Sequence, residues 1–208
     1  MGRRPLANAF SLPYSRLMSS ASLAVPAEST RAQILRVARQ LIQTRSYLGF
    51  SFQDLADQVG IRKASLYHHF PTKEALGVEV LREAGQGFRD WAAKPRAAEA
   101  ALDAYFRMYR QAMKAGAAVC PAGALAPGWD CINEELRQTV RELRSTQVMW
   151  LTGVLGALVH DAKPPVSAGA LAAYVFAACQ GALLSARMTG RVEDFDEAIA
   201  QLRQSIPR

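Results

Sequence analysis

The chain has 208 residues, half of them apolar, and a formal net charge of +7. This length and apolar content are enough for a packed core, which excludes a disordered chain. Three cysteines without a CxxC spacing exclude a disulfide framework and a zinc ribbon, and they indicate a reducing, cytoplasmic compartment. The positive charge favours a polyanionic partner.

The first 28 residues contain three arginines and many serines but no acid before Glu28. This composition is similar to that of a transit peptide, but prolines interrupt any long amphipathic helix and no continuous apolar segment is present. We expect a disordered arm over residues 1–28; a basic arm that touches DNA and a targeting segment are the alternatives. Met18 is also a candidate initiator, which leaves open whether residues 1–17 are translated.

A first helix is predicted from Thr30, because Thr30 and Gln33 have the spacing of a capping box. Apolar residues then recur at helical spacing and form one stripe. The stripe consists of Ile34, Leu35, Ala38, Leu41 and Ile42. We expect this helix to support the elements that follow it, and Arg31 at its start is a candidate for a phosphate contact.

Residues 51–76 have the pattern of two short helices separated by a tight turn. Ser51 and Asp54 can form a capping pair for the first helix, whose apolar residues fall at i, i+3, i+4 and i+7. Gly60 supplies the turn, since glycine takes positive φ at no steric cost. The second helix is expected over residues 63–69, before a proline stops it. The pattern predicts a helix-turn-helix, which lays its second helix in the major groove of DNA.

The second helix is expected to present hydrogen-bond donors and no acid. These are Arg62, Lys63, Ser65, Tyr67 and His68. Between residues 31 and 75, seven cations face three acids, an excess of four, so the positive charge gathers where DNA would sit. An ordinary helical hairpin with a polar face is the alternative.

The run Leu-Tyr-His-His-Phe-Pro-Thr-Lys-Glu-Ala-Leu over residues 66–76 resembles the signature of the TetR/AcrR family of one-component transcriptional regulators. The specific resemblance begins near Thr30; beyond residue 76 only length and helical texture are similar. It implies a dimeric, all-helical repressor with an N-terminal DNA-binding domain and a C-terminal ligand-binding and dimerisation domain. Arg62 stands where the family often has Ser or Thr, and Ala64 where it often has Gly. The first departure removes a side-chain cap and adds a cation at the DNA face.

The resemblance also implies roles at individual positions. Base contacts are expected from Gln53, Lys63, Ala64 and Ser65. Contacts to the DNA backbone are expected from Ser51, Tyr67, His68, His69 and Lys73, and Arg62 suits either role. In a homodimer on double-stranded DNA, two such helices would enter successive major grooves of a palindromic operator; pairs of dimers, which some members form, would change the spacing.

The domains follow from this division. After the arm, residues 29–76 are expected to form the DNA-binding domain and residues 77–208 the effector-binding and dimerisation domain. A helix from Thr72 to near Pro95 should connect the two and transmit displacements between them.

Further helices are predicted over residues 97–116 and from Asn133 to before the prolines at 164 and 165, with a loop or a broken short helix over residues 120–130. The expected fold is all-α, with about nine helices.

No charged residue occurs between Ser167 and Arg187. The stretch is long enough to cross a membrane, but its many small and hydroxyl side chains favour close helix packing instead, and we expect no membrane partner. The small residues at helical spacing are Ala170, Ala173, Ala177, Gly181 and Ser185. Together with a last helix over residues 194–206, this stretch is the candidate dimer interface (about 167–206); packing within one subunit is the alternative.

Aromatic and methionine side chains of the C-terminal helices are candidates to line an effector pocket, although such spacing more often belongs to an ordinary core. They are Trp91, Tyr105, Phe106, Tyr109, Met113, Trp129, Met149, Trp150 and Phe176. The effector is unidentified, and no cofactor or metal is predicted.

Cys120 precedes Pro121, and proline favours the first position of a helix, so Cys120 is expected at a helix N-cap. The helix dipole there stabilises a thiolate. Residues 120–126 and 134–137 also resemble the corresponding region of the N-ethylmaleimide-responsive branch of the family, which senses electrophiles through a cysteine. A buried structural cysteine is the alternative.

A cysteine-dependent enzyme is the competing function from another class. It would bring Cys120 or Cys131 to His68, His69 or His160. No phosphate loop, metal-spaced cluster or nucleotide fingerprint supports it. A regulator of the same fold that activates transcription, or that has no small-molecule effector, is the nearer alternative.

Overall fold

The computed structural model describes residues 28–114, 119–160 and 167–207. Within these ranges the chain forms eight α-helices and one 3-10 helix, and no strand, which confirms the all-α prediction. In chain order they are α1 (Thr30–Arg45), α2 (Phe52–Val59), α3 (Lys63–His69), α4 (Lys73–Ala92), α5 (Ala98–Lys114), η1 (Gly123–Cys131), α6 (Glu134–Leu158), α7 (Ala168–Thr189) and α8 (Val192–Gln204). The predicted arm up to residue 27 and the predicted helix end at residues 163–165 lie outside the described residues.

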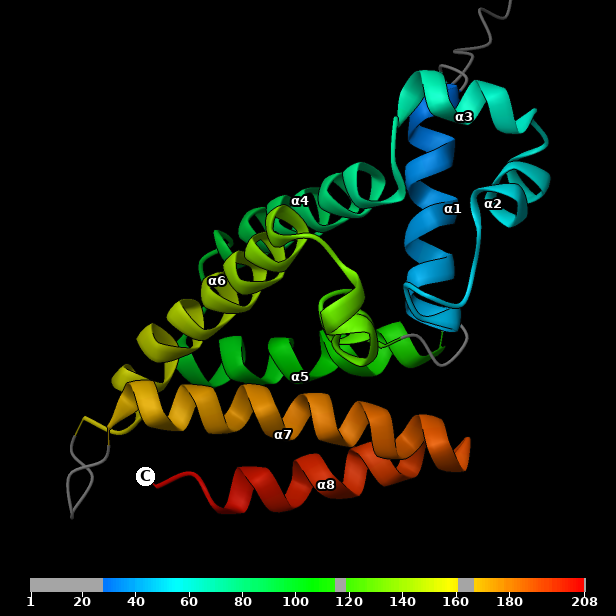
Figure 1. Ribbon diagram of the computed structural model, residues 1–208. Helices are drawn as coiled ribbons and strands as arrows, with labels where there is room; N and C mark the ends of the chain where they lie inside the picture. Colours follow the sequence, from blue (N-terminus) through cyan, green and yellow to red (C-terminus); the bar gives the residue numbers. More distant parts are fainter. Residues whose placement is uncertain (1–27, 115–118, 161–166, 208) are drawn as a thin grey trace, which may run out of the picture.

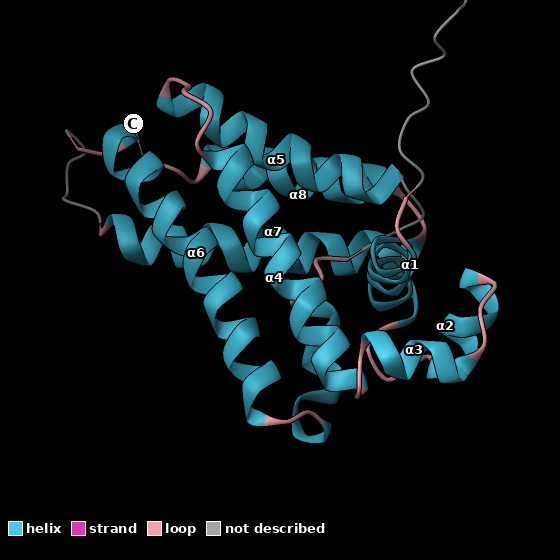
Figure 2. Cartoon of the chain, turned by 90° about the horizontal axis from the view of Figure 1, so that it is seen from above, coloured by secondary structure: helices cyan, strands magenta, loops and turns pink. Residues whose placement is uncertain are grey.

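The helices form two parts, a head of α1–α3 and a body of α4–α8 with η1 (Figure 1). In the body, α5, α7 and α8 lie side by side, while α4 and α6 pack together and cross them (Figures 1 and 2). The apolar core is continuous from the head into the body.

Short-range capping defines the head helices. Ser51 and Asp54 form the predicted capping box at the start of α2. Gly60 ends that helix at φ 77°, in the left-handed conformation that a side chain disfavours. The predicted capping box at Thr30 is wrong, because the side chain of Ser29 accepts from the Ala32 amide and Thr30 is already helical.

Two connections beside the helix-turn-helix are among those that join the head to the body. The first is the continuous helix α4, which Thr72 caps at the residue where the predicted helix begins. The second is a direct contact of the α1–α2 turn with the body. In this contact the Tyr47 amide donates to the Ala124 carbonyl of η1 at 3.4 Å, and the buried Tyr47 ring lies against α4 at Gly77.

The helices of the body pack through apolar stripes and a few polar ties. Asn133 caps α6 as predicted, and η1 is the broken short helix expected after residue 120, interrupted at Gly128. The Arg110 guanidinium binds both carboxylate oxygens of Asp196, which joins α5 to α8.

Helix α7 is the single described helix long and apolar enough to cross a membrane. Eight of its residues are buried, among them Leu171, Val175, Cys179 and Leu183, and they belong to the protein core. This packing accounts for the apolar residues on the buried side of α7.

Candidate nucleic-acid interface

One face of helix α3 packs into the apolar core, and the opposite face is exposed to solvent. Leu66 is fully buried, and Phe70 directly after the helix is also buried. Arg62, Lys63 and Ala64 are exposed at its start, and Ser65 is half-buried. The helix therefore offers its first turn and outer face to a partner, as a recognition helix does.

The two cations at the start of α3 lack an acidic partner among the described residues. Arg62 is the N-cap of the helix but makes no side-chain capping bond, as expected from its departure from Ser or Thr. Neither Arg62 nor Lys63 takes part in an ion pair within the described ranges. Their charge is therefore available to a polyanion.

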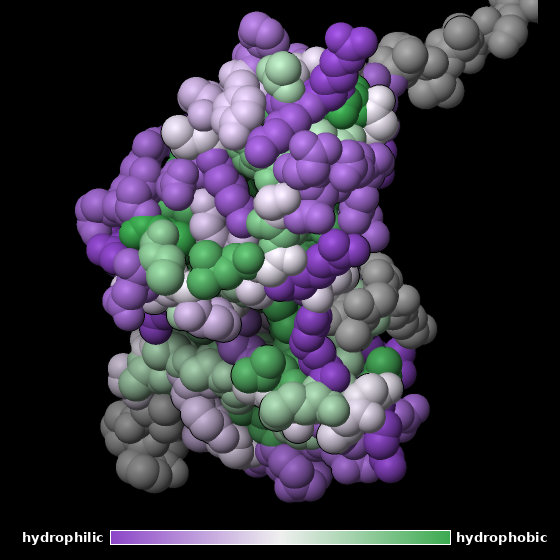
Figure 3. Space-filling view, turned by 45° about the vertical axis from the view of Figure 1, so that its right-hand side comes forward, coloured by the Kyte–Doolittle hydropathy of each residue, from purple (hydrophilic) through white to green (hydrophobic). Residues whose placement is uncertain are grey.

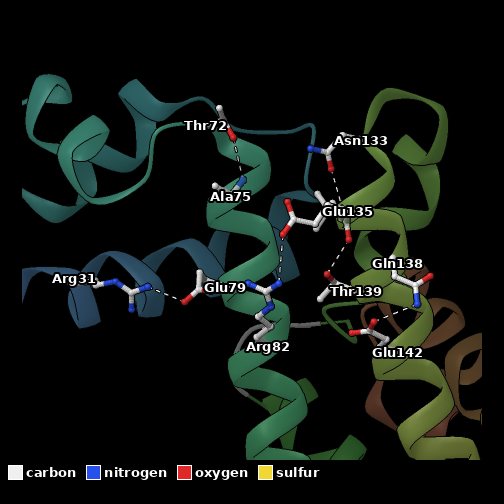
Figure 4. Close-up of polar contacts among 11 residues, drawn as sticks. Arg31, Thr72, Ala75, Glu79, Arg82, Asn133, Glu135, Gln138, Thr139 and Glu142 are labelled. Carbon is white, nitrogen blue, oxygen red and sulfur yellow. Dashed lines mark hydrogen bonds and ion pairs between the residues drawn. The ribbon is translucent and has the colours of Figure 1, made fainter.

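Three arginines of α1, in contrast, form ion pairs with acidic residues. Arg31 contacts Glu79 at 2.7 Å, Arg36 contacts Glu28 at 3.1 Å, and Arg39 contacts Glu83 at 3.0 Å. The Arg31–Glu79 pair joins α1 to α4 (Figure 4), and its hydrogen bond lowers the pKa of Glu79. Within the described ranges this pairing leaves Arg62 and Lys63 of α3, and Arg45 at the end of α1, as the head cations without an ion pair, and a phosphate would have to compete with Glu79 for Arg31.

The predicted contact residues of α2 are exposed but already hydrogen-bonded. Ser51 donates to Asp54 Oδ2 at 2.7 Å and accepts from the Asp54 amide at 3.2 Å. These bonds, led by the one from the Ser51 hydroxyl, lower the pKa of Asp54. Gln53 donates to Asp57 Oδ1 at 2.8 Å.

Tyr67, His68 and His69 lie on the exposed side of α3. The Tyr67 ring packs 5.2 Å from the Phe52 ring, which holds α3 against α2, and the residue remains 49% exposed. These placements leave all three side chains accessible, as a contact to the DNA backbone requires.

Lys73 is placed differently from the other predicted contacts. It is half-buried, its ammonium donates to the Phe50 carbonyl, and it lies over the rings of Phe50 and Tyr47 at 4.2 and 4.7 Å. Burial lowers its pKa. In this position Lys73 ties the start of α4 to the α1–α2 turn.

The body contains a buried polar group among the predicted effector residues. The hydroxyls of Tyr105 and Tyr109 donate to Gln147 Oε1 at 3.2 and 2.8 Å, and Gln180 donates to the Tyr109 hydroxyl at 3.1 Å. Burial raises the pKa of both tyrosines, so they remain neutral donors. Gln147 is not among the residues predicted from the sequence, although its place between Leu143 and Leu151, four residues from each, marks it as polar within an apolar stripe.

An inner cavity of about 330 Å³ lies between α4, α5 and α6 beside this group. Of the predicted effector residues, it brings together Trp91, Tyr109 and Cys120, and it adds Phe88 and Gln147. Its volume suits a small organic ligand.

Other predicted effector residues do not line this cavity. Met113 is buried in the core, Trp150 packs among neighbouring rings, and Trp129 lies near Arg137, which donates to its carbonyl at 3.0 Å. Met149 is 68% exposed.

Cys120 is buried, and its predicted position at a helix N-cap is wrong. The 3-10 helix begins at Gly123 with Ala122 as its N-cap, because the chain makes a turn first, in which the Ala124 amide donates to the Cys120 carbonyl. Cys120 lines the inner cavity, whereas His68 and His69 lie on α3. Cys120 and these two histidines therefore belong to different elements of the fold.

An N-terminal helix-turn-helix head on a helical body is the architecture of a DNA-binding transcriptional regulator. Residues 34–80 match the family of bacterial regulatory proteins called tetR. This match covers the helix-turn-helix and the adjoining parts of α1 and α4, and beyond it the likeness to TetR-family proteins is one of fold.

Known proteins similar to this chain show how far the likeness extends. The HTH-type transcriptional repressor KstR2 of Mycolicibacterium smegmatis is 40% identical over 63 residues, which are 30% of this chain and 29% of that protein. A TetR-family regulator from Agrobacterium tumefaciens superimposes with a TM-score of 0.79 at 27% identity, over 86% of this chain and 98% of the other.

The reduced form of NemR from Escherichia coli has a TM-score of 0.70 at 20% identity, over 86% and 98% of the two chains. At this identity the likeness shows a common fold, and membership of the electrophile-sensing branch stays a prediction.

Proposed function

We propose that this protein is a transcriptional repressor that binds a palindromic operator as a homodimer and leaves it when an effector binds the body. The observation that carries the proposal is the exposed start of α3, where Arg62 and Lys63 have no acidic partner among the described residues. The family match over the same part of the chain, and a repressor among its relatives, support it.

In the proposed complex, the start of α3 enters the major groove. Lys63, Ala64 and Ser65 are suited to base edges by their position, and Arg62 to a base or a phosphate. Tyr67, His68 and His69 flank them as candidates for phosphate contacts. The two heads of a dimer would lie about 34–36 Å apart, one turn of B-DNA.

The dimer is proposed to form through α7 and α8. One side of α7 is exposed and carries apolar or small residues at helical spacing, including Tyr174, Ala177, Gly181, Leu184 and Met188. Such a face permits close approach of a second helix, and an exposed apolar stripe favours a partner.

The inner cavity is the proposed effector site. Helix α4 is the proposed coupling element, because it lines this cavity and its first turn follows directly after α3 of the head. Coupling of this kind is typically about 1–3 kcal/mol. Cys120 is a candidate sensor within the cavity. If so, N-ethylmaleimide should weaken operator binding of the natural protein and not of Cys120→Ser; equal operator affinity in both after treatment would contradict the sensor role.

Mapping the binding sites of the purified protein across the source genome tests the function and yields the operator. Lys63→Ala should then weaken operator binding by about 1–3 kcal/mol and relax sequence preference, because a base contact is lost. Fluorescence anisotropy over a range of salt concentrations measures both effects.

Arg36→Ala is the matched control, because it removes a cation of the same head that is paired with Glu28. Its effect on operator affinity should be smaller and equal for all sequences. A protein that prefers no duplex over random competitor, or a Lys63→Ala variant that behaves like Arg36→Ala, would contradict the proposed interface.

A further inference from the structure

A second cavity lies between the head and the body, apart from the inner cavity. Its volume is about 530 Å³. The end of α1 supplies one wall, with Gln43 and Arg45, and α7 supplies the opposite wall, with Phe176, Gln180 and Leu184. Figure 3 shows the side of the molecule on which the hydrophilic head lies above the body, with hydrophobic side chains visible between them.

The lining of this interdomain cavity combines an apolar surface with positive charge. Arg45, Arg144 and Arg187 are among its lining residues, and none of the lining residues is acidic. The Arg144 guanidinium lies 5.6 Å from the centre of the Phe176 ring, and no ion pair of Arg144 occurs within the described ranges. Arg144 is exposed, so its charge is accessible to a ligand in the cavity.

The other two arginines differ in their surroundings. Arg187 donates to the carbonyls of Gln43, at 3.1 Å, and Thr44 in the last turn of α1, where a cation is favourable. Arg45 is exposed and, like Arg144, takes part in no ion pair within the described ranges. Arg144 is the cation best placed to receive a new anion, because it packs on the Phe176 ring that lines the cavity, and Arg45 and Arg187 add positive potential.

From these observations we infer that the interdomain cavity binds a small apolar molecule with one anionic group of the carboxylate type. The hydrocarbon part lies against Phe176 and Leu184, and the anionic group pairs with Arg144 through charge-assisted hydrogen bonds. The volume is within the range of small-molecule sites, and the absence of acid from the described lining selects against cations.

The site differs from the inner cavity in what it touches. The two cavities share Gln43 and Val119, but Arg45 and Ser46 of the head line only the interdomain one, and the hydrogen bond from Gln180 to the Tyr109 hydroxyl, at 3.1 Å, lies between them. A ligand between α1 and α7 contacts head and body at once. Its affinity must therefore depend on how the head is held, and by linkage it must change operator affinity. Only this last consequence depends on the proposed function.

Calorimetric titration of the full-length protein with decanoate, in the absence of DNA, tests the site. Decylamine is the matched probe of opposite charge. Decanoate should bind and decylamine should not. Arg144→Met should weaken decanoate binding about tenfold, since a charge-assisted contact is lost. Arg107→Met removes an exposed arginine of α5 that does not line the cavity, and it should leave affinity within about twofold.

Two glycines allow a second, steric test. Gly181 lines the interdomain cavity and Gly87 the inner one, and a Cβ on either would meet no atom within 4 Å. Gly181→Leu should therefore fill the interdomain cavity and weaken decanoate binding about tenfold or more, whereas Gly87→Leu should not. Light scattering on the same samples shows whether Gly181→Leu changes the oligomeric state.

Three results would overturn the inference. They are no decanoate binding, equal binding of decylamine, or loss of decanoate binding in Gly87→Leu while Gly181→Leu and Arg144→Met bind decanoate as the natural protein does. The last result would place the ligand in the inner cavity. Because the titrations contain no DNA, a failure of operator binding leaves their outcome unaffected, and a failure of the titrations leaves the proposed DNA binding standing.

Discussion

Tyr47 connects the head to the body at the level of a single side chain. Its ring is buried against Gly77 of α4 and lies under the ammonium of Lys73, but its hydroxyl has no hydrogen-bond partner among the described residues. Burial, with the nearby charge of Glu74, raises the pKa of this hydroxyl, so it stays protonated. The ring thus contributes packing, while the oxygen adds a desolvation cost.

Tyr47→Phe should leave the free energy of unfolding unchanged or raise it by up to about 1 kcal/mol, because the packing is kept and an unpaired hydroxyl is removed. Chemical denaturation measures the change. Tyr47→Ala is the reference for loss of the ring and should cost about 3–5 kcal/mol. A clear loss of stability in Tyr47→Phe would show that a bound water satisfies the hydroxyl.

The three cysteines differ in exposure, and this should decide their reactivity. Cys131 is exposed, whereas Cys120 and Cys179 are buried. Burial raises the pKa of Cys179 to about 12, which leaves very little thiolate at neutral pH.

Mass spectrometry after brief treatment with N-ethylmaleimide should find Cys131 alkylated in the folded protein and Cys179 only after unfolding. The denatured protein, in which all three cysteines react, is the control. Rapid alkylation of Cys179 in the folded state would contradict the packing of α7. Cys120 faces the inner cavity, so its rate measures access to that cavity.

At the scale of the elements, the turn between α1 and α2 sets the position of the helix-turn-helix. Gly49 lies so close to the end of α1 that a Cβ there would be 1.9 Å from the Arg45 carbonyl oxygen. The turn also receives the Lys73 ammonium at Phe50 and contacts η1 through Tyr47. Any side chain at Gly49 must therefore move backbone that several elements share.

Gly49→Ala should lower the free energy of unfolding by more than about 2 kcal/mol, since backbone atoms must shift to admit the methyl group. Gly87→Ala is the matched control in an open helical position, and it should be neutral or stabilising by up to about 1 kcal/mol. Thermal or chemical denaturation of the two variants gives the comparison. Equal stabilities would show that the turn adjusts freely.

At the scale of the whole molecule, the exposed side of α7 is the surface that the proposed dimer requires. Leu184 is 54% exposed and Met188 is 75% exposed. The small residues Ala177 and Gly181 lie between Tyr174 and Leu184 along the helix. A second copy packed on this face would set the distance between the two heads and hence the spacing of operator half-sites.

Ala177→Glu should raise the dimer dissociation constant by about a hundredfold or more, because it places an unpaired charge in the proposed interface. Met149→Glu is the control, since Met149 is an exposed apolar residue of α6 outside that interface. Sedimentation analysis measures the dissociation of both. A natural protein that is monomeric, or an Ala177→Glu variant that dimerises normally, would contradict the proposed interface.

Much of the helix-turn-helix could be predicted from the sequence, because its signals act over three or four residues. The Ser51–Asp54 capping box, the left-handed Gly60 and the Thr72 cap are all present in the structure. The predicted caps at Thr30 and Cys120 are wrong for an equally local reason. Ser29, one residue earlier, caps α1, and a turn after Cys120 moves the N-cap of η1 to Ala122.

The sequence by itself determined the all-helical class, the helix-turn-helix and the likeness of its N-terminal part to the TetR family, since these depend on local spacing and a short signature. Only the tertiary structure decided which cations remain available, because Arg31 meets Glu79 from 48 residues away while Arg62 and Lys63 meet no acid within the described ranges. It likewise decided that Lys73 is half-buried and that two cavities lie on either side of the Tyr109–Gln180 contact. Charge pairing and enclosed volume depend on residues brought together from distant parts of the chain, which no local pattern specifies.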